Sequence, residues 1–171
     1  MMQEAVFFSA GYYIGKSFAD YSLEWGRERR KTFFEGFYDD AKKVKEEGAG
    51  WIIAGNLFVE DTVSEAELRE IFSVLADVGK PVKMVPGKAD PAGEGSPYVC
   101  WDLPENVGIL GLKPEVEEFL GKRIRGFASS QVSLPSTGIQ DEEVWIFSFA
   151  PGFPLNISPG VVQVYGLSLI H

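Results

Sequence analysis

The stretch Ile52-Ile53-Ala54-Gly55-Asn56-Leu57-Phe58 decides the fold of this chain, because a short apolar strand here runs directly into a glycine turn. The pattern recurs in residues 82–91, where an apolar strand precedes Gly87. Both segments read as buried parallel strands, and open α/β sheets build their sites where the carboxyl ends of such strands open into turns. In place of a set of metal ligands, these two turns carry an amide, a lysine, an alanine and one aspartate: Asn56, Lys88, Ala89 and Asp90.

The composition indicates one acidic globular domain. The 171 residues are 45% hydrophobic and 13% aromatic, so residues 1–171 are expected to form a single domain with its own core. The net charge of -9 disfavours a broad phosphate-binding surface, so nucleic acid is not an expected partner. The single Cys100 excludes an internal disulfide framework and a cysteine zinc site, and we expect it to be a buried thiol. No apolar run reaches the roughly 18–20 residues of a membrane span, so we expect a cytoplasmic protein without a membrane partner.

The first half of the chain alternates strands and helices. Residues 5–9 read as a first buried strand and lead into a glycine-punctuated turn. Residues 22–47 have helical spacing and end at Gly48. Its basic run, residues 27–31, is expected to be a solvated helix face, with a recognition patch as the alternative. The apolar face of this helix is expected to hold Phe33, Phe34, Phe37, Ala41 and Val44.

A second strand and helix follow in the same way. Residues 51–54 are the second strand, and Ser64 with Glu67 forms the capping box of a second helix that ends at Gly79. Residues 82–85 are the third strand, which gives a β-α-β-α-β order and a parallel sheet with right-handed crossovers. The inner stripe of the second helix is expected to be Leu68, Ile71, Phe72 and Leu75.

The second half of the chain is richer in strands and turns. Residues 90–104 are expected to be a loop, and residues 129–143 a polar surface loop. A hairpin is expected around the Gly121-Lys122 turn. The expected strands are residues 107–110, 116–120, 123–128, 144–147 and 161–165. The fold class is therefore α/β (α+β), a sandwich of two mixed sheets flanked by helices.

Five motifs in order along the chain resemble those of calcineurin-like metallophosphoesterases, closest to the branch of DNA-repair exonucleases and small stand-alone phosphoesterases. That family carries an Asp-x-His turn, Gly-Asp, Gly-Asn-His-Asp/Glu, a His-Ala-Pro-like turn and a final Gly-His-x-His. The matching stretches here are Gly11-Tyr12-Tyr13-Ile14-Gly15, Gly55-Asn56-Leu57-Phe58, Gly87-Lys88-Ala89-Asp90, Ser148-Phe149-Ala150-Pro151 and Gly166-Leu167-Ser168-Leu169. The resemblance runs over essentially the full length and implies a metallophosphoesterase-like sandwich, without the family's last strands.

The metal ligands of the family are replaced in this chain. The family holds two divalent cations that activate a water and clamp phosphoryl oxygens. Of its site residues, Asp90 alone is kept, and in the family that residue orients the catalytic histidine, here Ala89. The positions that the resemblance assigns to the former metal site are Gly11, Tyr13, Asn56, Lys88, Ala89, Phe149, Leu167 and Leu169. We therefore expect no metal cofactor and no metal-dependent hydrolysis.

Three functions remain open from the sequence. The first is a catalytically inactive binding or assembly module, in which Tyr12, Tyr13, Phe58, Phe149 and Phe153 either form a partner-binding patch or fill the vacated site as core. The second is a metal-free site for a small anion or nucleotide, formed by Lys88 with Tyr13, Asn56 and Asp90, against the alternative of a solvent-exposed Lys88 or a Lys88–Asp90 pair. The third is a phosphoesterase with rearranged chemistry.

The third function lacks an evident base. The hydroxyls at Ser9, Ser148 and Ser168 are available, but the sole histidine is the terminal His171. Because the second sheet is expected to be short and to leave an edge, we also expect self-association as a dimer. The partner is thus a second copy or an unidentified protein.

Overall fold

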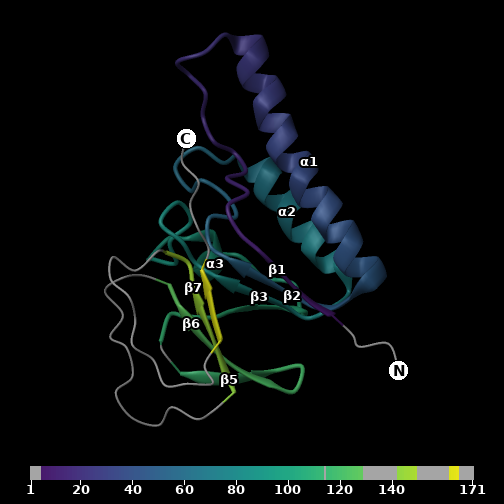
Figure 1. The fold of residues 1–171 in the computed structure, drawn as a ribbon. Helices are drawn as coiled ribbons and strands as arrows, with labels where there is room; N and C mark the ends of the chain where they lie inside the picture. Colours follow the sequence, from purple (N-terminus) through teal and green to yellow (C-terminus); the bar gives the residue numbers. More distant parts are fainter. Residues whose placement is uncertain (1–4, 114, 129–141, 150–161, 166–171) are drawn as a thin grey trace.

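Two helices, a parallel sheet and a second sheet form successive layers in this mixed α/β protein (Figure 1). The computed structural model describes residues 5–113, 115–128, 142–149 and 162–165. The helices are α1 (Leu23–Glu47), α2 (Glu65–Val78) and α3 (Pro97–Cys100). The strands are β1 (Ala5–Ser9), β2 (Gly48–Ala54), β3 (Val82–Val85), β4 (Val107–Ile109), β5 (Val116–Phe119), β6 (Lys122–Phe127), β7 (Glu143–Phe147) and β8 (Val162–Tyr165).

The first sheet confirms the predicted β-α-β-α-β order. Its strand order is β1-β2-β3-β4, and every neighbouring pair is parallel. The hydroxyl of Ser22 caps α1, and Ser64 and Glu67 form the predicted capping box of α2. Gly79 ends α2 with a φ of 64°, a left-handed conformation that glycine adopts without a steric penalty.

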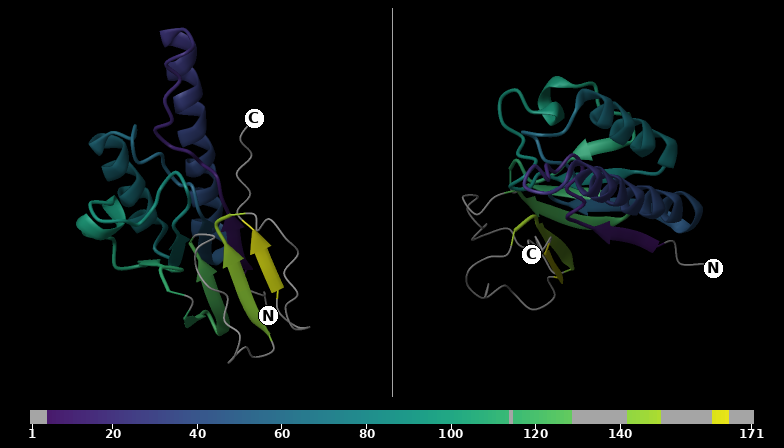
Figure 2. Two further views of the ribbon diagram at one scale, coloured as in Figure 1. Left: turned by 90° about the vertical axis from the view of Figure 1, so that its left-hand side faces the viewer. Right: turned by 90° about the horizontal axis from the view of Figure 1, so that it is seen from above.

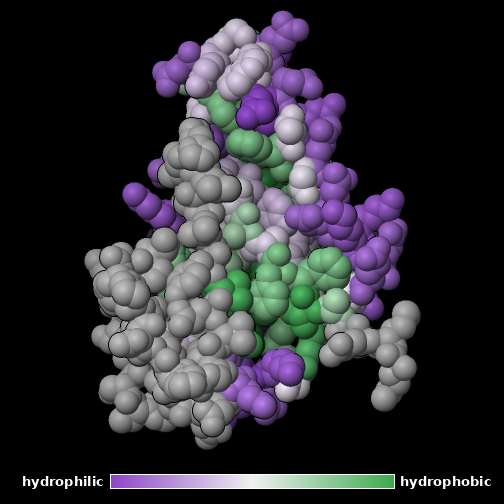
Figure 3. Space-filling model, in the orientation of Figure 1, coloured by the Kyte–Doolittle hydropathy of each residue, from purple (hydrophilic) through white to green (hydrophobic). Residues whose placement is uncertain are grey.

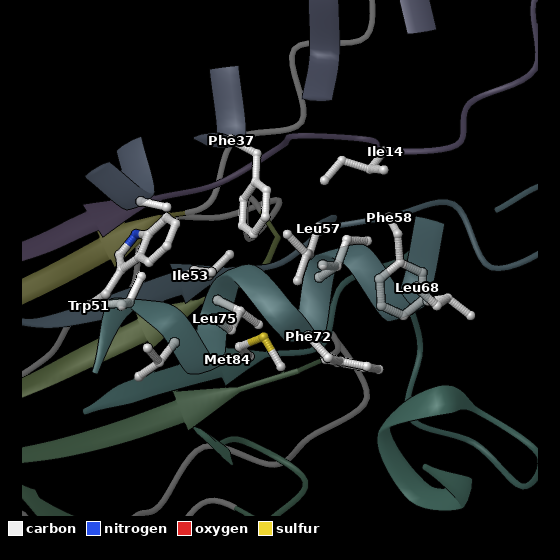
Figure 4. Close-up of a cluster of buried hydrophobic side chains, with 14 of the residues drawn as sticks. Ile14, Phe37, Trp51, Ile53, Leu57, Phe58, Leu68, Phe72, Leu75 and Met84 are labelled. Carbon is white, nitrogen blue, oxygen red and sulfur yellow. The ribbon is translucent and has the colours of Figure 1, made fainter. Parts of the chain in front are cut away.

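The central strand β2 contributes to two cores, because successive side chains of a strand point to opposite faces. Trp51 and Ile53 face the helices, where Figure 4 shows them close to Phe37 of α1. Ile52 and Ala54 face the second sheet. The predicted inner stripe of α2 is buried in full, whereas in α1 Phe37, Ala41 and Val44 are buried and Phe33 and Phe34 are half-buried.

The second sheet has the order β5-β6-β7-β8 and lies against the face of the first sheet that the helices leave open (Figure 2). The pair β5–β6 is antiparallel, and β6–β7 and β7–β8 are parallel. The prediction of two mixed sheets is therefore wrong for the first sheet, whose described strands are all parallel. Ile124 and Ile146 of the second sheet pack with Val85 of the first in the inter-sheet core.

The hairpin turn lies one residue earlier than predicted. Leu120 and Gly121 have φ values of 50° and 73°, and Lys122 already pairs with Phe119 in the ladder. A two-residue hairpin turn of this kind requires positive φ at both central residues, so Leu120 takes the left-handed conformation. The predicted centre at Gly121-Lys122 is thus corrected to Leu120-Gly121.

Residues 90–104 contain a short helix, α3, where a loop is predicted. Pro97 and Tyr98 are the buried residues of α3, and Cys100 at its end is exposed. The predicted buried thiol is therefore wrong, because α3 turns its apolar side inward at Pro97 and Tyr98 and leaves Cys100 on the outer side.

Glu143 is not part of a surface loop, as the sequence suggests, but the first residue of β7, and its exposed fraction is 0%. Its carboxylate accepts hydrogen bonds from Arg125 Nε at 2.6 Å, Trp145 Nε1 at 3.0 Å and Arg123 at 3.2 Å. A buried carboxylate is tolerated only when it is paired and hydrogen-bonded. The rest of the predicted loop, residues 129–141, lies outside the described residues.

We predict that Glu143→Gln lowers the free energy of unfolding by about 2–4 kcal/mol, because the substitution leaves buried Arg125 without its counter-charge. Urea denaturation measures the effect. The exposed neighbour Glu142 gives the matched control, since Glu142→Gln is expected to change stability by less than about 0.5 kcal/mol. Equal effects of the two substitutions would contradict the buried ion pair.

Candidate functional site

The carboxyl ends of β1, β2 and β3 meet at one edge of the first sheet, as predicted. The turn after β1 is tied to the turn after β2 by hydrogen bonds from Gly11 N–H to Gly55 O at 3.1 Å and from Tyr13 N–H to Asn56 O at 2.9 Å. The turn after β3 joins them where Ala89 N–H donates to Asn56 Oδ1 at 3.0 Å. The structure therefore brings four of the predicted positions to one place: Gly11, Tyr13, Asn56 and Ala89.

The carboxylate of Asp90 is the centre of this place. Its Oδ1 accepts hydrogen bonds from the backbone N–H groups of Asn56 and Gly87, both at 2.8 Å. Its Oδ2 accepts from Leu57 N–H at 2.9 Å and from the Tyr98 hydroxyl at 2.5 Å. Asp90 itself is fully buried. One side chain thus holds together the β2 turn, the β3 turn and helix α3.

The electrostatics of Asp90 and Tyr98 follow from their burial. Burial raises the pKa of Asp90 to about 6, although the four donors to its carboxylate act in the opposite direction. Burial, and then the nearby Asp90 carboxylate, raise the pKa of Tyr98 well above its usual range. Tyr98 is consequently a neutral hydrogen-bond donor to Asp90 at physiological pH.

The second sheet closes the site from the other side. Gly55 has a φ of 86°, and a Cβ there would stand 2.7 Å from Cβ of Ser148, so only glycine fits. The Ser148 hydroxyl donates to Pro86 O at 2.6 Å and is buried. The Ser9 hydroxyl accepts a hydrogen bond from Trp51 Nε1 at 2.7 Å. Both hydroxyls considered as nucleophiles therefore have structural partners, and Ser168 lies outside the described residues.

The aromatic residues near the strand ends divide between core and boundary. Phe58 is fully buried in the helix-side core, and the ring of Tyr12 packs edge-on against Phe37 and Trp51. The Tyr12 hydroxyl donates to Asp40 of α1 at 2.5 Å. Tyr13 and Phe149 are half-buried. Tyr12 and Phe58 therefore pack with the core and do not form an exposed patch. Phe153 lies outside the described residues.

Lys88 is exposed and stands apart from this cluster. The backbone N–H groups of its neighbours Gly87 and Ala89 already donate to Asp90 and Asn56. An anion at Lys88 would therefore meet a single flexible ammonium group rather than a set of backbone donors. The Lys88–Asp90 pair, the other alternative, does not form, because Asp90 is buried among its own donors.

The donor set does not fit the two-metal centre that the resemblance implies. Within residues 5–113, 115–128, 142–149 and 162–165, no group of three or more histidine, cysteine, aspartate and glutamate side chains lies in a position to hold a metal ion. Asn56 Oδ1 already accepts a backbone hydrogen bond. The remaining predicted positions, Leu167 and Leu169, and the terminal His171 lie outside the described residues.

Sequence reasoning missed Tyr98 as part of this cluster, and it named Ser148 only as part of the fourth motif and as a candidate nucleophile. Ser96-Pro97 is a helix-start signal that could have placed Tyr98 in a buried first turn. No local pattern marks the contact of Ser148 with Pro86, because 62 positions separate the two residues.

No family model matches the chain, and no curated protein matches it either. Across the residues with described structure, no helix is both long and apolar enough to cross a membrane.

We predict that Asp90→Ala lowers the free energy of unfolding at neutral pH by about 2–4 kcal/mol, because it leaves buried donors without an acceptor. Urea denaturation measures the loss. Asp102→Ala, at an exposed aspartate, is the control and is expected to cost less than about 0.5 kcal/mol.

The same pair of proteins tests the pKa of Asp90. A carboxyl whose pKa is raised in the folded state stabilises the protein most below its unfolded pKa, and this contribution is lost as the pH rises through the folded pKa. The stability gap between the natural chain and Asp90→Ala should therefore narrow between about pH 4 and pH 7, by up to roughly 3 kcal/mol. A gap that widens with rising pH would show that hydrogen bonding outweighs burial at Asp90.

Proposed function

We propose that this chain is a catalytically inactive, metal-free protein of metallophosphoesterase-like fold that acts as an assembly module. The observation that carries the proposal is the Asp90 cluster. At the strand ends, Asn56 at a former metal position accepts a hydrogen bond from Ala89 N–H, and the neighbouring buried Asp90 carboxylate accepts four hydrogen bonds from protein groups.

Charge and packing at the strand ends support this proposal. A bridging cation needs an anionic ligand, and Asn56 supplies a neutral amide oxygen that is already in use. Lys88, in the adjacent turn, adds a positive charge on the exposed side of the strand ends. A Cβ at Gly55 would stand 2.7 Å from Cβ of Ser148, so the turn after β2 packs directly against the end of β7. These features favour a structural role for the former site.

The anion-binding alternative at Lys88 has weaker support, because the neighbouring backbone donors are engaged. The alternative of a phosphoesterase with a rearranged metal site would need ligands that the described residues do not group together. The alternative of a rearranged metal site is tested by the experiment below.

We predict that untagged protein gives no saturable heat with Mn²⁺ in calorimetry and no metal-dependent hydrolysis of a phosphodiester in the same sample. A tag-free chain is essential, since a histidine tag would bind the metal itself. Stoichiometric Mn²⁺ binding with turnover would overturn the proposal in favour of a rearranged metal site.

The surface that we propose for assembly is the free edge of β1. In the described part of the chain β1 pairs with β2 alone, so its outer backbone groups have no strand partner there. Phe8 of β1 is 44% exposed, and so is Leu120, which approaches Gly50 beside β1. Figure 3 shows apolar surface where β1 crosses the front of the molecule below α1. An exposed apolar edge of this kind favours pairing with another chain.

A second copy of the chain is the proposed occupant. Two identical edge strands can pair antiparallel about a two-fold axis, the commonest symmetry of soluble oligomers. The apolar side chains beside both edges would then be covered together, which removes two exposed patches in one contact.

We predict a dimeric mass by light scattering at micromolar concentration, and a dimer weakened at least about tenfold by Phe8→Thr, which keeps the strand propensity but removes the apolar ring. Val99→Thr, at another exposed apolar residue on α3, is the matched control and should leave the mass unchanged. A monomeric mass of the natural chain, or equal effects of both substitutions, would contradict assembly through β1.

A further inference from the structure

A pocket lies between residues 16–21 and the first two turns of α1, away from the Asp90 cluster and from the β1 edge. Its volume is about 360 Å³, within the size range of small-molecule sites. Figure 1 shows that this half of α1 extends beyond the sheet, with the segment that follows β1 running beside it. The pocket therefore has walls that belong to neither of the two cores.

The local sequence holds this pocket open. Ser22 caps α1, and the ring of Phe18 packs on the helix against Trp25 and Phe33, with ring centroids 5.5 and 5.6 Å apart. Gly26 lets the backbone of Phe18 approach, since a Cβ at Gly26 would stand 3.3 Å from Cβ of Phe18. The loop is thereby fixed against one face of the helix, and the pocket lies beside this contact.

The charged side chains that line the pocket are of one sign. Lys16, Arg27 and Arg30 line it, and no carboxylate does, although the whole chain carries a net charge of -9. Arg30 is fixed by Glu67 of α2 through hydrogen bonds of 2.6 and 2.5 Å. Lys16 and Arg27 form no ion pair within the part of the chain that is described. Two cations at the pocket are thus available to a ligand.

Apolar and aromatic side chains supply the remaining wall. Tyr21 and Leu23 line the pocket and are 59% and 71% exposed. The Tyr21 ring lies with its centroid 4.2 Å from that of Trp25, so its orientation is constrained. The amino end of the 25-residue α1 adds a partial positive charge in the same region. Together these groups suit a ligand that has both a negative charge and a flat apolar part.

A larger hollow between the carboxyl-terminal halves of α1 and α2 lacks this character. Its volume is about 810 Å³, but both lysines and carboxylates line it, and Lys45 and Asp77 pair there at 2.8 Å. Side chains of both signs therefore line this hollow, which has no group of unpaired cations like the one beside residues 16–21.

We propose that the pocket beside α1 binds a small anion that carries an aromatic ring, with Lys16 and Arg27 holding the anionic group and Tyr21 contacting the ring. This inference is independent of the proposed assembly function. The same chemistry is offered by a nucleoside monophosphate and by an aromatic carboxylate, so both serve as probes. A cation next to an aromatic face favours such ligands over a bare phosphate.

The test is calorimetric titration of the natural chain with adenosine 5′-monophosphate, benzoate, adenosine and inorganic phosphate. We expect one of the two anionic aromatic probes to bind saturably, and at least about tenfold more tightly than adenosine or phosphate. The tighter of the two identifies the source of the ligand. No saturable binding of either probe would overturn the proposal.

Paired substitutions locate the binding. The double substitution Lys16→Gln and Arg27→Gln should lower the affinity for the bound probe at least about tenfold. The control, Lys42→Gln with Arg69→Gln, removes two exposed cations elsewhere on α1 and α2 and should change the affinity less than about twofold. If both double substitutions lower the affinity equally, the probe is held by the net charge of the protein rather than by the pocket. Unchanged thermal unfolding of the variants confirms that each has folded.

Discussion

The Asp90 carboxylate is the interaction on which the strand ends of the first sheet depend. The turns that follow β2 and β3 would otherwise bury backbone N–H groups without acceptors. One buried carboxylate with two oxygens satisfies three such groups and the Tyr98 hydroxyl. Asn56 extends the cluster, because its amide oxygen accepts from Ala89 while its own carbonyl accepts from Tyr13. The polar groups that a catalytic site would direct at a substrate are here directed at one another.

The layers follow from the need to cover a parallel sheet on both faces. The helices cover one face, and β2 presents Ile52 and Ala54 to the other, which the second sheet covers. The second sheet in turn carries rings on its opposite face, where Phe127 stacks on Phe147 with centroids 4.6 Å apart. Glu143 lies on that same face with Arg125. An ion pair placed among aromatic rings has few competing partners, which favours a single register of β6 against β7.

The sequence predicts the first half of the fold well, because the signals there are local. Helical spacing, the Ser64–Glu67 capping box and the glycines at helix ends all act within a few residues. The errors arise where distant contacts decide the outcome. Glu143 looks like a loop residue until Arg125, eighteen positions earlier, pairs with it across two strands. The candidate site also has a predictable part and an unpredictable part. The strand order predicts that Asn56 and Asp90 lie close together, but the hydrogen bond from Tyr98 depends on how α3 packs against the turns.

A closed set of hydrogen bonds at the strand ends has a consequence for the rest of the surface. Tyr13 and Asn56 keep left-handed backbones, with φ values of 50° and 56°, and such conformations persist only where the surroundings fix them. At Asn56 the surroundings are Asp90 and Ala89, both within the cluster, so the strain is balanced by internal contacts rather than by a ligand. Groups that another molecule can contact are also found away from this cluster. The described structure offers two such regions, the apolar edge of β1 and the cationic pocket beside α1, and neither shares a residue with the hydrogen bonds of Asp90.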